Sequence, residues 1–220
     1  MDPVMRQTPS SQCMSLLPPP ARLERVTRAL AVLDAILCEE WDLRIHSFQQ
    51  RWDEARGERM ASARDGSGDS WFIVFSEHGA FMLGFAHESR LASRGARAAL
   101  LDGLPTVFAH SAVEPAFSMD DISFALWNVG RGWHRARLEL PDGRDPDGSA
   151  ELMRLLGGEP ADYVRFAGEY FERELSLTAV RAVYVGAPVT EALLAALGSE
   201  RTLEGLRDDL DEVGWDGEIE

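Results

Sequence analysis

The sequence contains no lysine, so all 22 of its basic side chains are arginine. Several catalytic systems depend on a lysine: the phosphate-binding loop, Schiff-base chemistry, the Ser-x-x-Lys nucleophile and the ATP site of kinases. The absence of lysine therefore excludes these reaction classes. Asparagine is also scarce, because Asn128 is its one occurrence.

Cysteine and long apolar runs are scarce as well. The two cysteines, Cys13 and Cys38, form neither a disulfide framework nor a metal-ligand spacing, which indicates a reducing compartment. No apolar run approaches the roughly 20 residues that span a bilayer, and the N-terminus has no long apolar stretch typical of a secretory signal. We therefore expect a cytoplasmic protein without membrane association.

Acidic side chains outnumber basic ones by 37 to 22, which gives a formal net charge of −15. Such a charge disfavours non-specific binding to nucleic acid or to anionic membranes, and it suits a basic protein partner. A hydrophobic share of 45% is ordinary for a globular protein with a substantial core. The length of 220 residues favours a single domain with accessory helices.

The stretch from residue 60 to residue 88 is the most informative part of the chain. Two apolar runs, 71–75 and 81–85, flank the polar turn 76–79, a pattern typical of an antiparallel hairpin. Because antiparallel strands return to the same end, the loop Asp65–Asp69 and the residues after the second run should lie together.

The rest of the chain predicts further elements around this hairpin. Residues 1–20, which end in three prolines, are expected to be a disordered leader before a single domain at 21–220. The pattern predicts helices at 23–37, 90–102, 160–175, 188–197 and 202–213, and a short helix capped by Ser149; strands at 41–46, 60–64 and 180–185; a second hairpin at 122–128 and 133–140; a loop at 49–59; and a short helix or irregular connector at 104–113. These elements define an α+β fold, with a mainly antiparallel sheet built from two hairpins and packed by the N-terminal helix and a helical C-terminal third.

The best candidate site is the end of the central hairpin, where Asp65, Asp69, His87 and Glu88 would gather. The alternating carboxylates of the Asp65–Asp69 loop resemble the start of a calcium loop, but the twelfth position is Ser76, where such a loop needs an acid. A turn shaped by glycine is the simpler interpretation. The five histidines share no zinc spacing, and no nucleophile elbow occurs, so we assign no catalytic residue, metal or cofactor.

A second candidate surface is acidic. Carboxylates accumulate in the loop 142–147 and in the last predicted helix with its tail, where Asp208, Asp209, Asp211, Glu212, Asp216, Glu218 and Glu220 lie. Trp52 and Trp215 stand in polar surroundings, so they are candidates for contacts with a partner. An ordinary solvated face is the alternative interpretation of the charge.

These features predict a non-enzymatic cytoplasmic binding protein whose acidic surface meets a basic toxin or enzyme. In size, charge and lack of catalytic motifs the chain resembles bacterial immunity proteins, and this resemblance implies an inhibitor; it involves no sequence motif. The alternative is a metal-assisted hydrolase that uses Asp65, Asp69, His87 and Glu88.

Overall fold

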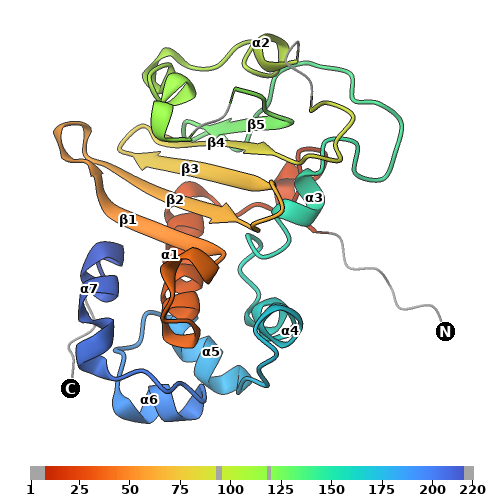
Figure 1. Cartoon of the computed structure of the whole chain (residues 1–220). Coiled ribbons are helices and arrows are strands. Elements are labelled where there is room, and N and C mark those ends of the chain that lie inside the picture. The colour runs from red at the N-terminus through yellow and green to blue at the C-terminus, as the bar shows by residue number, and fades with distance from the viewer. Residues whose placement is uncertain (1–7, 93–95, 118–119, 216–220) are drawn as a thin grey trace.

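The computed structural model describes residues 8–92, 96–117 and 120–215. Its centre is one antiparallel sheet whose five strands lie side by side in chain order (Figure 1). The strands are β1 His46–Asp53, β2 Glu58–Arg64, β3 Ser70–Ser76, β4 Gly79–Phe85 and β5 Phe124–Asn128. Together with the helices that pack on it, this sheet confirms the predicted α+β class.

The central hairpin is the part of the fold that the sequence predicted best. β3 and β4 pair in register from Ser70 opposite Phe85 to Ser76 opposite Gly79. The turn needs glycine, because Gly79 has φ +126° and a Cβ there would lie 1.9 Å from the backbone oxygen of Asn128. Both faces of the hairpin are buried, so its strands belong to the core, and Phe72, Val74, Phe81 and Leu83 are each at most 2% exposed.

A helical layer covers one face of the sheet and an irregular segment covers the other (Figure 1). The helices are α1 Pro20–Leu37, α2 Arg97–Leu100, α3 Ser149–Leu152, α4 Pro160–Tyr170, α5 Leu177–Tyr184, α6 Glu191–Ala196 and α7 Leu203–Val213. α1 packs directly on the sheet, and α5 and α7 pack against α1. Among the described helices, none has the length and apolar character to cross a lipid bilayer.

Two expectations about the first strand were wrong. The strand expected at 41–46 is instead a 3-10 helix, Trp41–Leu43, followed by β1, and most of the loop expected at 49–59 belongs to β1 and β2. The apolar alternation of Trp41 and Leu43 looked like a half-buried strand, yet both side chains are exposed. β1 itself is largely polar. Phe48 is its one fully buried apolar residue, and it lies in the same core cluster as the buried face of α1.

Two other predicted strands were also wrong. The second hairpin has its first strand, β5, but after it a single bridge joins Trp127 to His134, and the backbone carbonyls of Ala136 and Leu138 accept from the Arg135 side chain. The strand predicted at 180–185 is part of α5. The Ser176 hydroxyl caps that helix, and its apolar stripe packs in the main core.

Several helices are shorter than predicted. α2 occupies four residues of the expected helix 90–102, and the connector 104–113 contains two 3-10 turns. α4 ends at Tyr170, and Gly148 takes the capping position that the sequence suggested for Ser149.

The described part of the expected leader is docked on the domain, which differs from the prediction of disorder at 1–20; residues 1–7 lie outside the described residues. The Ser11 hydroxyl donates to the buried carboxylate of Asp147, and its backbone N–H donates to Ser149 Oγ at 2.9 Å. The indole N–H of Trp133 donates to the carbonyl of Pro18 at 2.7 Å. These hydrogen bonds attach the leader to the domain through buried polar groups. The hydrophobic periodicity of the sequence does not predict contacts of this kind.

Candidate partner-binding end of the sheet

Three connections meet at one end of the sheet, where β1 begins and β2 and β4 end. The backbone N–H of Arg64, the last residue of β2, donates to the carbonyl of Ile45 at 3.0 Å. The backbone N–H of His87, just after β4, donates to Asp69 Oδ1 at 2.7 Å. The structure therefore brings together the segments that precede β1, join β2 to β3 and follow β4, and α3 and α4 lie near this end (Figure 1).

Asp65 shapes the connection between β2 and β3. Its Oδ1 accepts from the backbone N–H groups of Ser67 at 2.8 Å and of Asp69 at 3.0 Å, and its Oδ2 accepts from the Ser67 hydroxyl at 2.6 Å. Gly66 and Gly68 both have positive φ. The loop is thus the glycine-shaped turn favoured by the sequence, with Asp65 as its internal brace.

His87 and Asp69 form a close pair at this end. His87 Nδ1 donates to Asp69 Oδ1 at 2.6 Å, while about half of the His87 side chain (48%) is exposed. The hydrogen bond to Asp69 raises the pKa of His87, and the charges of Asp69, Glu88 and Asp65 act in the same direction. Glu88 is exposed and its carboxylate has no bond to any described residue, so it does not join the pair.

These side chains do not assemble a metal centre. Within the described residues, no group of three or more His, Cys, Asp or Glu side chains is arranged to hold a metal ion. Asp65 is saturated by its own loop, and Asp69 is occupied by His87. The hydrolase alternative therefore gains no support from the geometry.

A buried carboxylate fixes the elements beneath this end. Asp34, on α1, is fully buried, and its Oδ2 accepts from the backbone N–H of Ile45 at 3.1 Å and of His46 at 2.8 Å. Its Oδ1 accepts from the Tyr163 hydroxyl at 2.7 Å, and burial together with the Asp34 charge raises the pKa of Tyr163. Asp34 thereby joins α1 to the start of β1 and to α4.

The segment between α1 and β1 is also held rigidly. Arg44 Nε donates to the carbonyl of Cys38 and Arg44 Nη2 to that of Glu39, each at 2.8 Å. The Arg44 guanidinium is in turn bound by Asp209 of α7, and Arg201 binds the same carboxylate at 2.6 Å. The loop that carries residues 39–43 is therefore fixed from below by a charged network.

Glu39, Glu40 and Asp42 in this loop are exposed, and their carboxylates form no hydrogen bond or ion pair with any described residue. We call the set of carboxylates at this end of the sheet the acidic end; it comprises Glu39, Glu40, Asp42, Asp65, Asp69 and Glu88. The sequence prediction missed the first three, because Asp42 was assigned to a strand at 41–46 and Glu39 and Glu40 directly precede it.

On the second predicted surface, on α7, Asp209 has a structural role. Burial alone would raise the pKa of Asp209, but hydrogen bonds from Arg44 and Arg201 outweigh it and hold the pKa below its usual range. Asp211 lies 3.6 Å from Arg51, and Glu212 accepts from Gln49 at 3.4 Å. Asp208 is exposed. Asp216, Glu218 and Glu220 lie outside the described residues.

Acids of the loop 142–147 and the two candidate tryptophans also make contacts within the protein. Asp145 accepts from the backbone N–H groups at the start of α3, and Asp147 is buried in its bonds with the serines described above. Trp52 stacks on Phe117 at 5.7 Å, and the Trp215 indole donates to the carbonyl of Ala187. Both tryptophans are half-buried.

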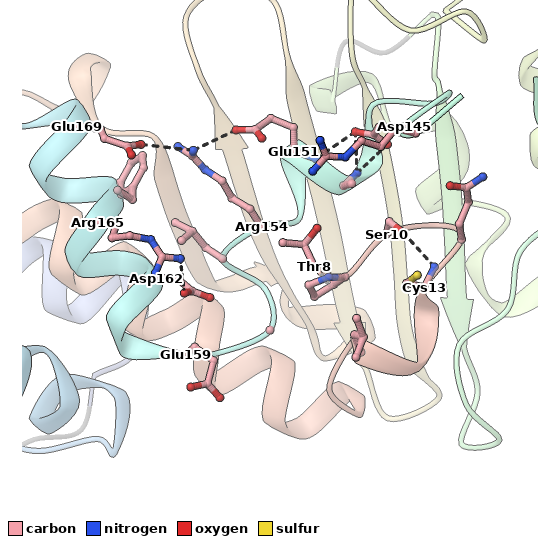
Figure 2. Close-up of a pocket in the computed structure, with 18 residues that line it drawn as sticks. Thr8, Ser10, Cys13, Asp145, Glu151, Arg154, Glu159, Asp162, Arg165 and Glu169 are labelled. Atoms are coloured by element: carbon pink, nitrogen blue, oxygen red, sulfur yellow. Dashed lines mark hydrogen bonds and ion pairs between the residues drawn. The ribbon is translucent and has the colours of Figure 1, made fainter. Parts of the chain in front are cut away.

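A groove of ≈ 940 Å³ lies between the docked leader and α4 (Figure 2). Thr8, Ser10 and Cys13 form one wall, and Asp162, Arg165 and Glu169 belong to the other. Its charged lining is Arg144, Asp145, Glu151, Arg154, Glu159, Asp162, Arg165 and Glu169, five acids against three bases. Because Arg154 and Arg165 are paired with these acids, the groove offers little to an anion.

One cluster resembles a catalytic triad without being one. His110 Nε2 lies 2.9 Å from Glu58 Oε1 and 3.2 Å from Ser111 Oγ. A serine–histidine–acid triad uses both ring nitrogens, one for the acid and one for the nucleophile. Here the acid and the hydroxyl share one nitrogen, so the cluster cannot relay a proton in that way.

Comparison with protein-family models, with curated proteins and with solved structures finds no significant match to this chain.

Proposed function

We propose that this is a non-enzymatic cytoplasmic binding protein that inhibits a basic enzyme or toxin, as immunity proteins do, and that it meets its partner through the acidic end. The observation that carries this proposal is the contrast between two sets of acids. On α7 Asp209 is bound by Arg44 and Arg201 and Asp211 lies 3.6 Å from Arg51, whereas Glu39, Glu40, Asp42 and Glu88 are all exposed and their carboxylates form no bond with any described residue.

Unpaired carboxylates that crowd together repel one another, so they contribute little to folding. A basic partner removes that repulsion and is drawn in by long-range attraction, which raises the association rate and orients the encounter. The rigid support of the loop by Arg44 limits the entropy lost on binding.

Photo-crosslinking in the native host tests the proposal. p-Benzoylphenylalanine is placed at position 42 or 88 in the full chain. The matched control carries it at position 208, an exposed position on α7. Positions 42 and 88 should capture the same positively charged protein, and position 208 should not. The purified partner should then lose its activity when this protein is added.

Efficient capture at position 208, capture of an acidic protein, or no capture at positions 42 and 88 would each contradict the proposal.

A further inference from the structure

The acidic end also carries exposed apolar side chains. Among the described residues eight large hydrophobic side chains are exposed, and three of them lie here: Trp41 at 47%, Leu43 at 54% and Tyr170 at 43%. The Tyr170 hydroxyl donates to the carbonyl of Leu43 at 3.0 Å, which joins the end of α4 to the 3-10 helix. Exposed apolar side chains on neighbouring segments are a feature of protein interaction surfaces.

Contacts within the protein hold Tyr170 and the turn that carries Trp41 and Leu43. The Tyr170 ring stacks on Phe166 at 5.6 Å and meets Phe171 edge-on at 4.8 Å. Burial raises the pKa of Tyr170, and the charges of Asp34 and Asp65 add to this effect, so the ring lies within electrostatic reach of the acidic end. Trp41 and Leu43 share a turn whose flanking carbonyls Arg44 holds. Rigid aromatic residues of this type supply much of the affinity in protein interfaces.

The surrounding charge decides what can cover the cluster. A second copy in a symmetric contact would place carboxylates against carboxylates, and an anionic membrane would be repelled in the same way. A basic protein surface has the complementary charge. Trp and Tyr rings also attract the cations that flank an apolar side chain on such a surface.

We propose that Trp41, Leu43 and Tyr170 are the anchor of the interface, and that they receive an apolar side chain flanked by arginine or lysine on the partner. This inference rests on the proposed function and adds the residues that supply affinity. The carboxylates attract and orient the partner, and the anchor slows its dissociation.

Fluorine NMR with two synthetic peptides tests the anchor. The six tryptophans are replaced by 5-fluorotryptophan, and the Trp41 signal is assigned with Trp41→Phe. Both peptides carry two arginines at each end; the apolar peptide has leucine and phenylalanine between them, and the polar peptide has two serines. The apolar peptide should bind about tenfold more tightly and shift the Trp41 signal. Trp41→Ala and Leu43→Ala should each remove most of that advantage.

Val185→Ala is the matched control, because Val185 is 83% exposed and lies on α5's C-terminal end, apart from the cluster in sequence and element. It should leave both affinities unchanged. Equal binding of the two peptides, unaffected by Trp41→Ala, would overturn the anchor and leave attraction by the acidic end intact. Binding of neither peptide would overturn both the anchor and the proposed function.

Discussion

Asp209 binds Arg44 through both carboxylate oxygens, at 2.6 Å to Nη1 and 3.2 Å to Nη2. The two side chains are 165 residues apart in the sequence, and only 17% of Asp209 and 8% of Arg44 is exposed. Arg44 also donates hydrogen bonds to the carbonyls of Cys38 and Glu39, at the start of the loop 39–43. An acid that the sequence suggested as a partner contact is thus a support for the loop that carries unpaired acids.

The Asp209→Asn variant should lose stability. The amide leaves Arg44 and Arg201 without their shared counter-charge in a half-buried place, and such a loss costs on the order of 3 kcal/mol of unfolding free energy. Asp208→Asn, on the exposed face of the same helix, should change it by no more than about 0.5 kcal/mol. Urea denaturation measures both. Equal effects of the two substitutions would show that the network carries no stability.

The stability that Asp209 contributes should depend on pH. Because its pKa is lowered in the folded state, the contribution is fully present above the unfolded value of about 3.9 and is lost as the pH falls through the lower folded value. The difference between the wild type and Asp209→Asn should therefore be constant from neutral pH to about pH 5 and shrink below about pH 4. A difference that persists undiminished at pH 3 would contradict this assignment.

Docking of residues 8–20 predicts that the leader is not dispensable. Ser11→Ala removes a donor from the buried Asp147 and should cost about 1–3 kcal/mol, whereas Ser15→Ala, at an exposed position, should cost almost nothing. A chain that begins at Ala21 should melt at a clearly lower temperature than the full chain. Identical melting of the two chains would show that these bonds contribute nothing.

His87 should titrate above its ordinary value of about 6.5, because Asp69 stabilises its charged form. The bond's contribution to stability is present below about pH 6.5 and fades as the pH rises through the folded pKa. NMR titration of the His87 ring should show this raised pKa, and Asp69→Asn should return it towards the ordinary value. If Asp69→Asn left the pKa of His87 unchanged, the Asp69 carboxylate would not be the group that raises it.

The sequence predicted the fold class and the central hairpin, because aromatic and β-branched runs around a glycine turn are local signals. It failed where burial depends on distant partners. Trp41 and Leu43 alternate like strand residues but are exposed, and residues 180–184 of the β-branched run are helical, with their apolar stripe packed towards α1. Hydrophobic periodicity shows only how apolar residues are spaced, whereas packing against the rest of the protein decides whether a segment is a helix or a strand.

The candidate site was predicted in part for the same reason. Antiparallel pairing alone places His87 beside Asp69, so this pair follows from the hairpin. The role of Asp209 depends on Arg44 and Arg201, whose approach no local pattern encodes. The exposed carboxylates of residues 39–42 were missed because the sequence predicts a strand at 41–46, where the structure has the 3-10 helix Trp41–Leu43.

A backbone amide NMR titration of the full chain with a decalysine peptide at low salt shows where a basic partner binds. Chemical-shift changes should concentrate at residues 39–43, 65–69 and 87–88, and they should disappear as salt screens the charges. The variant that combines Glu39→Gln, Glu40→Gln and Asp42→Asn should lose most of this response, whereas Asp208→Asn should keep it. Shift changes centred on residues 203–213, or spread evenly over the surface, would contradict the claim that the acidic end is the binding surface.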